Sequence, residues 1–163
     1  MLTFEQMAMR FLIAILLGAV IGWEREAIGK DAGIRTAILV AAGSCMFTMM
    51  SITLPYIISI SQQNLQDVLA LNSGFLGMAA GIVTGIGFLG AGIIMKTEQR
   101  VRGLTTAAIV WMTAAVGTSV GLGLISFAAF AALLVTFLLY LLRKAKLYEH
   151  IRPGQRVEPE NGD

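Results

Sequence analysis

Two short polar segments, residues 24–35 and 96–102, hold side chains that could bind an anion. An apolar stretch follows each segment and is expected to begin a helix, whose N-terminus offers unpaired N–H groups and a positive dipole end. Arginine beside such an end suits a phosphate, a lipid headgroup or the acidic patch of a partner protein. The residues predicted to make these contacts are Arg35, Thr36, Arg102, Thr105 and Thr106.

The same segments also have a structural interpretation, in which their arginines only fix the orientation of the chain in a membrane. Glu24, Glu26 and Asp31 then neutralise these arginines. Asp and Thr side chains are also preferred as helix N-caps. The candidate caps are Asp31 or Thr36 for the first helix and Thr105 or Thr106 for the second.

Polar residues elsewhere are few and lie near the ends of apolar stretches. Arg10 could pair with Asp67 or Glu5, or it could extend its side chain to the membrane surface. The possible polar site residues are therefore Glu24, Glu26, Asp31, Asp67, Asn72 and Arg10.

No catalytic constellation is present in the sequence. There is no nucleophile elbow, phosphate-binding loop or zinc signature. Cys45 is the single cysteine and His150 the single histidine. We therefore expect no enzyme activity, no catalytic residue, no cofactor and no metal site.

The composition predicts an integral membrane protein. Of the 163 residues, 56% are hydrophobic and only 13% are charged, whereas a soluble domain carries about 25% charged residues. This balance argues against a disordered protein, a nucleic-acid-binding domain and most soluble enzymes. The expected partner of most of the surface is the lipid bilayer.

Long runs without charge predict five membrane spans in an all-α fold. A helix needs about 20 apolar residues to cross the hydrocarbon core. One transmembrane domain is expected over residues 1–142, followed by a short, mobile cytoplasmic tail at 143–163. The predicted spans are residues 4–23, 36–59, 68–95, 104–121 and 124–142.

The positive charges predict the orientation of these spans. If the polar segments alternate between the two sides, Arg10 alone of the 12 Lys and Arg residues falls on one side. Positive segments stay in the cytoplasm, so the N-terminus is expected outside and the C-terminus inside. Residues 33–40 resemble 103–110, which fits a parallel repeat of helix pairs 1–2 and 3–4 or chance similarity in a glycine-rich chain.

Glycines are concentrated in the third predicted span, which holds seven of the 18. Spacing of four residues lets two helix backbones approach closely, inside the bundle or between subunits of a homo-oligomer. The alternative is that the segment Gly85–Gly92 breaks the helix and lines a cavity or pore. The residues in question are Gly77, Gly81, Gly85, Gly87, Gly90 and Gly92.

Several of these segments, in this order, resemble the MgtC/SapB family of bacterial inner-membrane proteins. The resemblance covers about residues 8–125 and rests on Glu24–Glu26, Ala32–Thr36, Gly85–Met95 and Val101–Ala108, with Trp111 and Gly117. It implies a five-span, multi-pass protein of the bacterial plasma membrane. The chain is similar to a short member, without the ACT-like cytoplasmic domain that some members carry at the C-terminus.

The resemblance also implies a link to growth under low magnesium and to virulence. Some members are thought to bind and restrain the F-type ATP synthase, which is a possible partner by resemblance alone. The expected function is therefore a regulatory role through contacts with membrane proteins. The alternative is a small oligomeric transporter or channel for an ion or solute.

Overall fold

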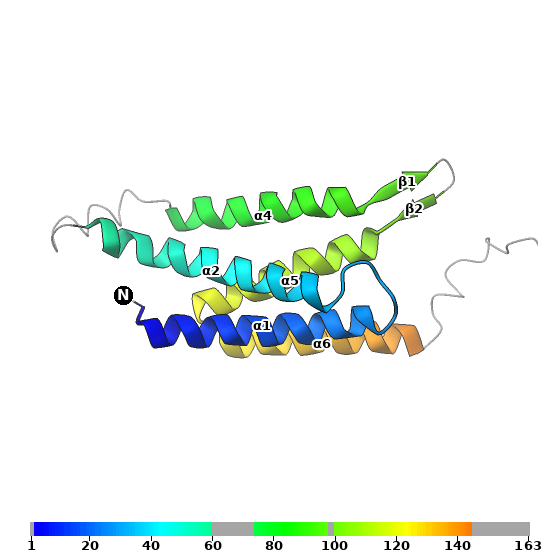
Figure 1. Cartoon of the computed structure of the whole chain (residues 1–163), viewed down its shortest axis with the longest axis horizontal. Helices are drawn as coiled ribbons and strands as arrows, with labels where there is room; N and C mark the ends of the chain where they lie inside the picture. Colours follow the sequence, from blue (N-terminus) through cyan, green and yellow to red (C-terminus); the bar gives the residue numbers. More distant parts are fainter. Residues whose placement is uncertain (1, 60–73, 98–99, 145–163) are drawn as a thin grey trace, which may run out of the picture.

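The computed structural model describes residues 2–59, 74–97 and 100–144, and these form a bundle of five helices with one short hairpin (Figure 1). The hairpin joins α4 to α5 where the sequence predicts only a loop, and Lys96 lies opposite Val101 in its antiparallel pair. The elements are α1 (Phe4–Glu26), α2 (Ile34–Ile58), α4 (Gly74–Ile93), β1 (Met95–Thr97), β2 (Arg100–Arg102), α5 (Leu104–Leu122) and α6 (Ile125–Lys144).

Four helices, α1, α2, α5 and α6, are long and apolar enough to cross a membrane. The fifth, α4, has 20 residues, and its apolar part Gly77–Ile93 is shorter than the other four. Residues 68–73 of the predicted third span lie outside the described residues, as do Asp67 and Asn72.

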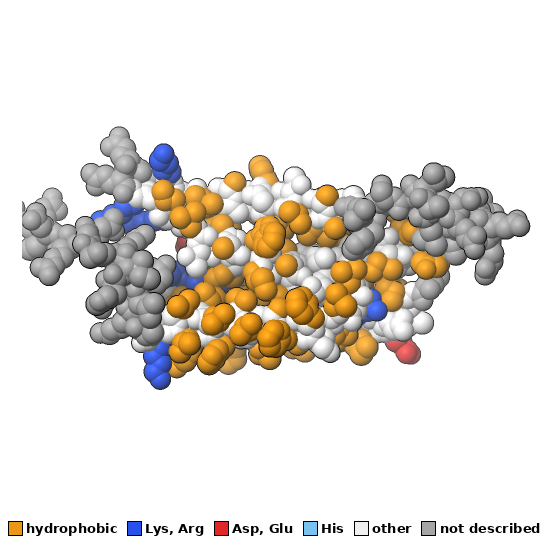
Figure 2. Space-filling model, turned by 180° about the vertical axis from the view of Figure 1, so that it is seen from behind, with side chains coloured by type: hydrophobic (Ala, Val, Ile, Leu, Met, Phe, Trp, Pro, Cys, Tyr) orange, Lys and Arg blue, Asp and Glu red, His pale blue; other side chains and the backbone are white. Residues whose placement is uncertain are grey.

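Successive helices run in opposite directions, so the end of one helix and the start of the next lie at the same end of the bundle (Figure 1). One end of the bundle, here called the basic end, is where α1 and α4 finish and α2 and α5 begin. Lys and Arg side chains gather there, while hydrophobic side chains cover the middle of the face seen in Figure 2. The last turn of α6 also lies at this end (Figure 1). The described basic residues at the basic end are Arg25, Lys30, Arg35, Lys96, Arg100, Arg102, Arg143 and Lys144.

Glycines on α1 lie directly against α2. A Cβ atom on Gly18 would lie 2.7 Å from the carbonyl oxygen of Ala37, and one on Gly22 would lie 2.5 Å from Cα of Ile34. No ordinary side chain fits at either position. The two helices therefore touch backbone to backbone, as small residues allow in a membrane protein.

A second glycine contact joins α5 to α2. A Cβ atom on Gly117 would collide with the carbonyl oxygen of Ala41, and one on Gly121 would lie 2.8 Å from that of Cys45. Around these contacts the side chains of Ile21, Cys45, Met49, Val116 and Val120 form the main buried cluster. These two seams make α2 the central helix of the bundle.

The helix α4 lies at the edge of the bundle and packs differently. Ile86 and Ile93 contact a smaller cluster with Val110 and Ala114 of α5. In contrast, Cβ atoms at Gly77, Gly81 and Gly85 would meet nothing within 4 Å. None of the described residues thus covers the glycine face of α4.

The segment Gly85–Gly92 does not interrupt α4, which continues as a helix to Ile93. The broken helix considered from the sequence is therefore not found. Gly87 and Gly92 are exposed, whereas Gly90 is buried and a Cβ atom there would lie 3.6 Å from Cβ of Ala107.

Replacing Gly117 by Ala should destabilise the protein, because the new methyl group would push α5 away from Ala41. We expect a loss of about 1–3 kcal/mol, the usual cost of overpacking, measured as thermal or denaturant unfolding of the purified protein in detergent. Gly81→Ala is the matched control, since it adds the same methyl group in open space and should leave stability unchanged or raise it by about 1 kcal/mol. Equal losses in both variants would contradict the seam.

Candidate functional site

The start of α2 is capped by a side chain that the sequence analysis did not assign to it. Gly33 is the N-cap in extended conformation, and the N–H of Ile34 donates to Oε2 of Glu26 at 2.9 Å. The expectation that Asp31 or Thr36 caps this helix is wrong. The loop folds back so that a carboxylate from the end of α1 reaches the positive end of α2.

Among the described residues, no side chain caps the start of α5. Its N-cap is Gly103, with φ of 86°, and no described side chain accepts from the N–H groups of the first turn. A Cβ atom on Gly103 would collide with the carbonyl oxygen of Ile93, so the close approach of α4 and α5 requires glycine there. The expectation that Thr105 or Thr106 caps α5 is also wrong.

Arg25, in the last turn of α1, reaches the first turn of α5. Its side chain is 4% exposed, and Nη2 donates to Oγ1 of Thr106 at 3.2 Å. Nε of Arg25 and Oε2 of Glu24 are buried and have no hydrogen-bond partner. The structure thus brings Arg25 to Thr106, whereas Arg35 and Arg102 are exposed.

The sequence analysis missed Arg25 as a site residue. It was counted only among the positive charges that set the orientation, since neither hydropathy nor spacing shows that a side chain at a helix end turns inward. The available signal was its place inside the segment Glu24–Glu26, one of those that carry the family resemblance.

At the opposite end of the bundle, Arg10 closes the turn between α5 and α6. Its Nη1 donates to the carbonyl oxygen of Gly121 at 2.7 Å. Gly123 follows with φ of 90°, and a Cβ atom there would lie 2.9 Å from Nη2 of Arg10. The expected partner Asp67 lies outside the described residues, and the guanidinium binds a helix C-terminus in place of Glu5 or the membrane surface.

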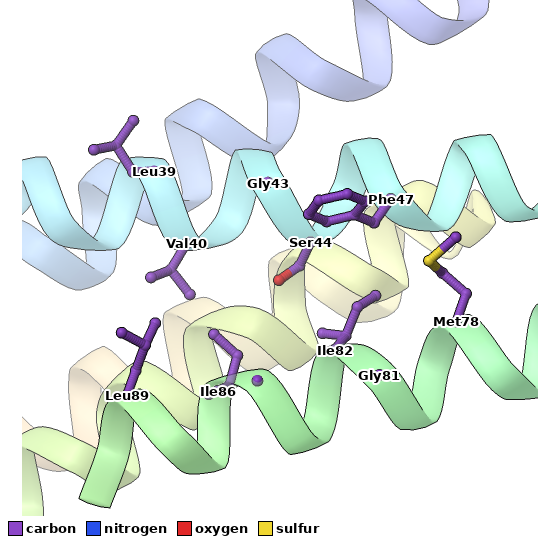
Figure 3. A pocket seen from close by; sticks show the side chains of 11 residues that line it. Leu39, Val40, Gly43, Ser44, Phe47, Met78, Gly81, Ile82, Ile86 and Leu89 are labelled. Carbon is purple, nitrogen blue, oxygen red and sulfur yellow. The ribbon is translucent and has the colours of Figure 1, made fainter. Parts of the chain in front are cut away.

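Between α2 and α4 runs an apolar groove of about 470 Å³. Figure 3 shows the side chains of Phe47, Ile82 and Ile86 around it, with the hydroxyl of Ser44 turned toward α4. Glycines supply part of both walls. The other lining residues are Leu39, Val40, Gly43, Met78, Gly81, Gly85 and Leu89.

Within the part of the chain that the structure describes, no three His, Cys, Asp or Glu side chains lie close enough to hold a metal ion. The features on which a function could rest are the Arg25–Thr106 contact at the basic end and the apolar groove beside α4.

Apolar helices of this length, packed through glycine seams and basic at one end, define a helical membrane protein. Residues 11–148 match the MgtC family. The chain belongs to this family.

Curated relatives agree with the assignment. The chain is 36% identical over 140 residues to the putative magnesium transporter YhiD of Escherichia coli K12, covering 82% of this chain and 60% of that protein. It is 44% identical over 130 residues to protein MgtC of Brucella abortus, covering 80% of this chain and 48% of that protein. It is also 44% identical over 126 residues to protein SrpB of Synechococcus elongatus, covering 72% of this chain and 64% of that protein.

The chain thus spans about half to two thirds of the length of these relatives. No solved structure matches it significantly.

Replacing Arg10 by Gln should destabilise the turn between α5 and α6, because a charged donor to the carbonyl of Gly121 is lost. We expect about 1.5–3 kcal/mol, the range for hydrogen bonds to charged groups, measured as unfolding in detergent. Lys30→Gln, in an exposed loop at the basic end, should have no such effect. If both variants unfold alike, the Arg10 contact carries no stability.

Proposed function

We propose that this MgtC-family protein is a regulatory membrane protein that acts through contacts with other membrane proteins rather than as an enzyme. The open glycine face of α4, with Gly77, Gly81 and Gly85 and the groove beside it, carries this proposal. In a bilayer, small residues of this spacing are where two helices associate. We assign this face to a second copy of the chain, in a homo-oligomer.

We further propose five spans in the bacterial inner membrane, with α4 as the third. The N-terminus would lie outside and the basic end in the cytoplasm, in keeping with the positive-inside rule. Alternation of helix direction along the chain (Figure 1) is compatible with this topology. The pairs α1–α2 and α4–α5 would form the two halves of a parallel repeat.

The biological setting that we propose is adaptation to low magnesium, with a role related to virulence. It rests on the family and on the names of relatives such as protein MgtC of Brucella abortus. A membrane complex such as the F-type ATP synthase is the kind of partner that the family resemblance favours.

Gly81→Leu should weaken the association between two copies of the chain, because the larger side chain would fill the groove beside α4 and cover its glycine face. We expect the oligomer to dissociate about tenfold more readily, equivalent to about 1.4 kcal/mol, in native mass spectrometry or light scattering of the detergent-solubilised protein. Co-purification of the membrane partner from cells should fall in parallel.

Ala80→Leu is the matched control, because Ala80 is exposed on the same helix and does not line the groove. Neighbouring residues leave a helix about 100° apart, so this variant should associate like the wild type. A wild-type protein that is monomeric in both detergent and lipid nanodiscs, and that retains no membrane protein on purification, would contradict the proposal.

The second candidate function is a small oligomeric transporter or channel. The name of the YhiD relative favours it, as do the hydroxyls of Ser51 and Thr53, which are buried in α2 and have no hydrogen-bond partner among the described residues. Such hydroxyls are suited to a polar solute inside the membrane.

Magnesium flux into proteoliposomes, followed with a dye inside the vesicles, separates the two functions. A transporter should lose flux in Gly87→Leu and Gly90→Leu while both variants still insert. Absence of Mg²⁺ flux in correctly inserted wild-type protein that still retains its membrane partner would favour the regulatory function.

A further inference from the structure

The charge of Arg25 is buried, and no anionic side chain among the described residues pairs with it. Only 4% of the residue is exposed, and a buried guanidinium has lost the hydration that stabilised it. Its side-chain bonds within the described residues amount to the donation from Nη2 to the neutral hydroxyl of Thr106, while Nε is buried and unpartnered. Burial of a cation is ordinarily balanced by a paired anion.

The first turn of α5 adds to the positive potential at this point. Thr106 lies in that turn, and the N–H groups of Leu104, Thr105 and Thr106 precede the first partners that the helix itself can offer. No described side chain caps them. A guanidinium and the positive end of a helix repel one another, so the arrangement is stabilised when an anion lies against both.

The start of α2 shows what a satisfied helix start looks like in the same molecule. There the carboxylate of Glu26 accepts from the N–H of Ile34 at 2.9 Å. Arg25 has carboxylates on both sides in sequence, Glu24 and Glu26. Glu26 caps α2, and the side chain of Glu24 leaves α1 about 100° around the helix from that of Arg25. Oε2 of Glu24 is buried and has no hydrogen-bond partner among the described residues, so Glu24 does not cap α5 as Glu26 caps α2.

We propose that Arg25, Thr106 and the first N–H groups of α5 bind a phosphate-type oxyanion at the basic end of the bundle. A tetrahedral oxyanion accepts from a planar guanidinium and from converging backbone donors at once. The hydroxyl of Thr106 accepts from Arg25 and keeps its own O–H to donate. Inorganic phosphate and the phosphate of a lipid headgroup offer the same chemistry to these groups.

This site goes beyond the regulatory function proposed above and is independent of it. It also relocates the anion contact predicted from the sequence. The contact lies at Arg25 rather than Arg35, and at the start of α5 rather than at both helix starts.

Hydrogen exchange of the full-length protein in a neutral detergent tests the site without any variant. Phosphate, compared with chloride at the same ionic strength, should slow exchange of the amides at 104–106. The amide of Ile34 is the internal control and should not change, because its N–H already donates to Glu26. No protection at 104–106 by phosphate or by anionic lipid, or equal protection at both helix starts, would overturn the proposal.

Variants then test the role of Arg25. Phosphate should raise the melting temperature of the protein. Arg25→Gln should need about tenfold more phosphate than the wild type for the same rise, in line with loss of a charge-assisted bond. Arg25→Lys keeps the charge without the planar fork, so its phosphate requirement should lie between those of Arg25→Gln and the wild type. Arg35→Gln should match the wild type. If Arg25→Gln or Arg25→Lys folds and binds phosphate as tightly as the wild type, Arg25 is not a ligand.

Nanodiscs distinguish the two sources of phosphate. Protection at 104–106 in phosphatidylcholine discs on addition of inorganic phosphate assigns a soluble anion. Protection in phosphate-free buffer that requires phosphatidylglycerol in the disc assigns a lipid headgroup. Either result supports the site, and its failure would leave oligomerisation through α4 unaffected.

Discussion

Direct contact of the α2 backbone with the backbones of α1 and α5 is the constraint on which the rest of the structure depends. Gly18 and Gly22 bring α1 to within contact of Ala37 and Ile34, and Gly117 brings α5 onto the carbonyl of Ala41. Lipid is as apolar as the buried side chains, so burial alone gives no drive for these helices to associate in a membrane. Close packing and the polar contacts at the helix ends must hold them together.

Both ends of the bundle are built around these seams. With α1 and α5 both held against α2, Arg10 reaches the carbonyl end of α5 and Arg25 reaches its start. The first contact is electrostatically favourable, since a cation meets the negative end of a helix. The second places a cation at a positive end, and no anionic side chain among the described residues pairs with it. The same packing leaves α4 at the edge, with its glycine face open beside the groove of Figure 3.

The membrane class, the approximate position of each helix and the family could be predicted from the sequence, because charge-free runs and the ordered motifs are local properties. The helix caps could not. Glu26 replaces Asp31 at α2 because a loop folds back, and Gly103 is dictated by the carbonyl of Ile93, which lies on another helix. Identical spacing of small residues gave no way to tell the packed Gly117 from the open Gly81. The inward turn of Arg25 likewise depends on Thr106, which is distant in sequence.

Disulfide cross-linking in native membranes tests most directly the central claim that α4 presents its glycine face to a second copy. Cys45 is buried and is the single cysteine, so Cys45→Ala provides a background for single cysteines. Gly81→Cys in this background should form a cross-linked dimer on mild oxidation, while Phe137→Cys, exposed on α6, should not. Absence of a dimer from Gly81→Cys, or equal dimer from both positions, would contradict the account.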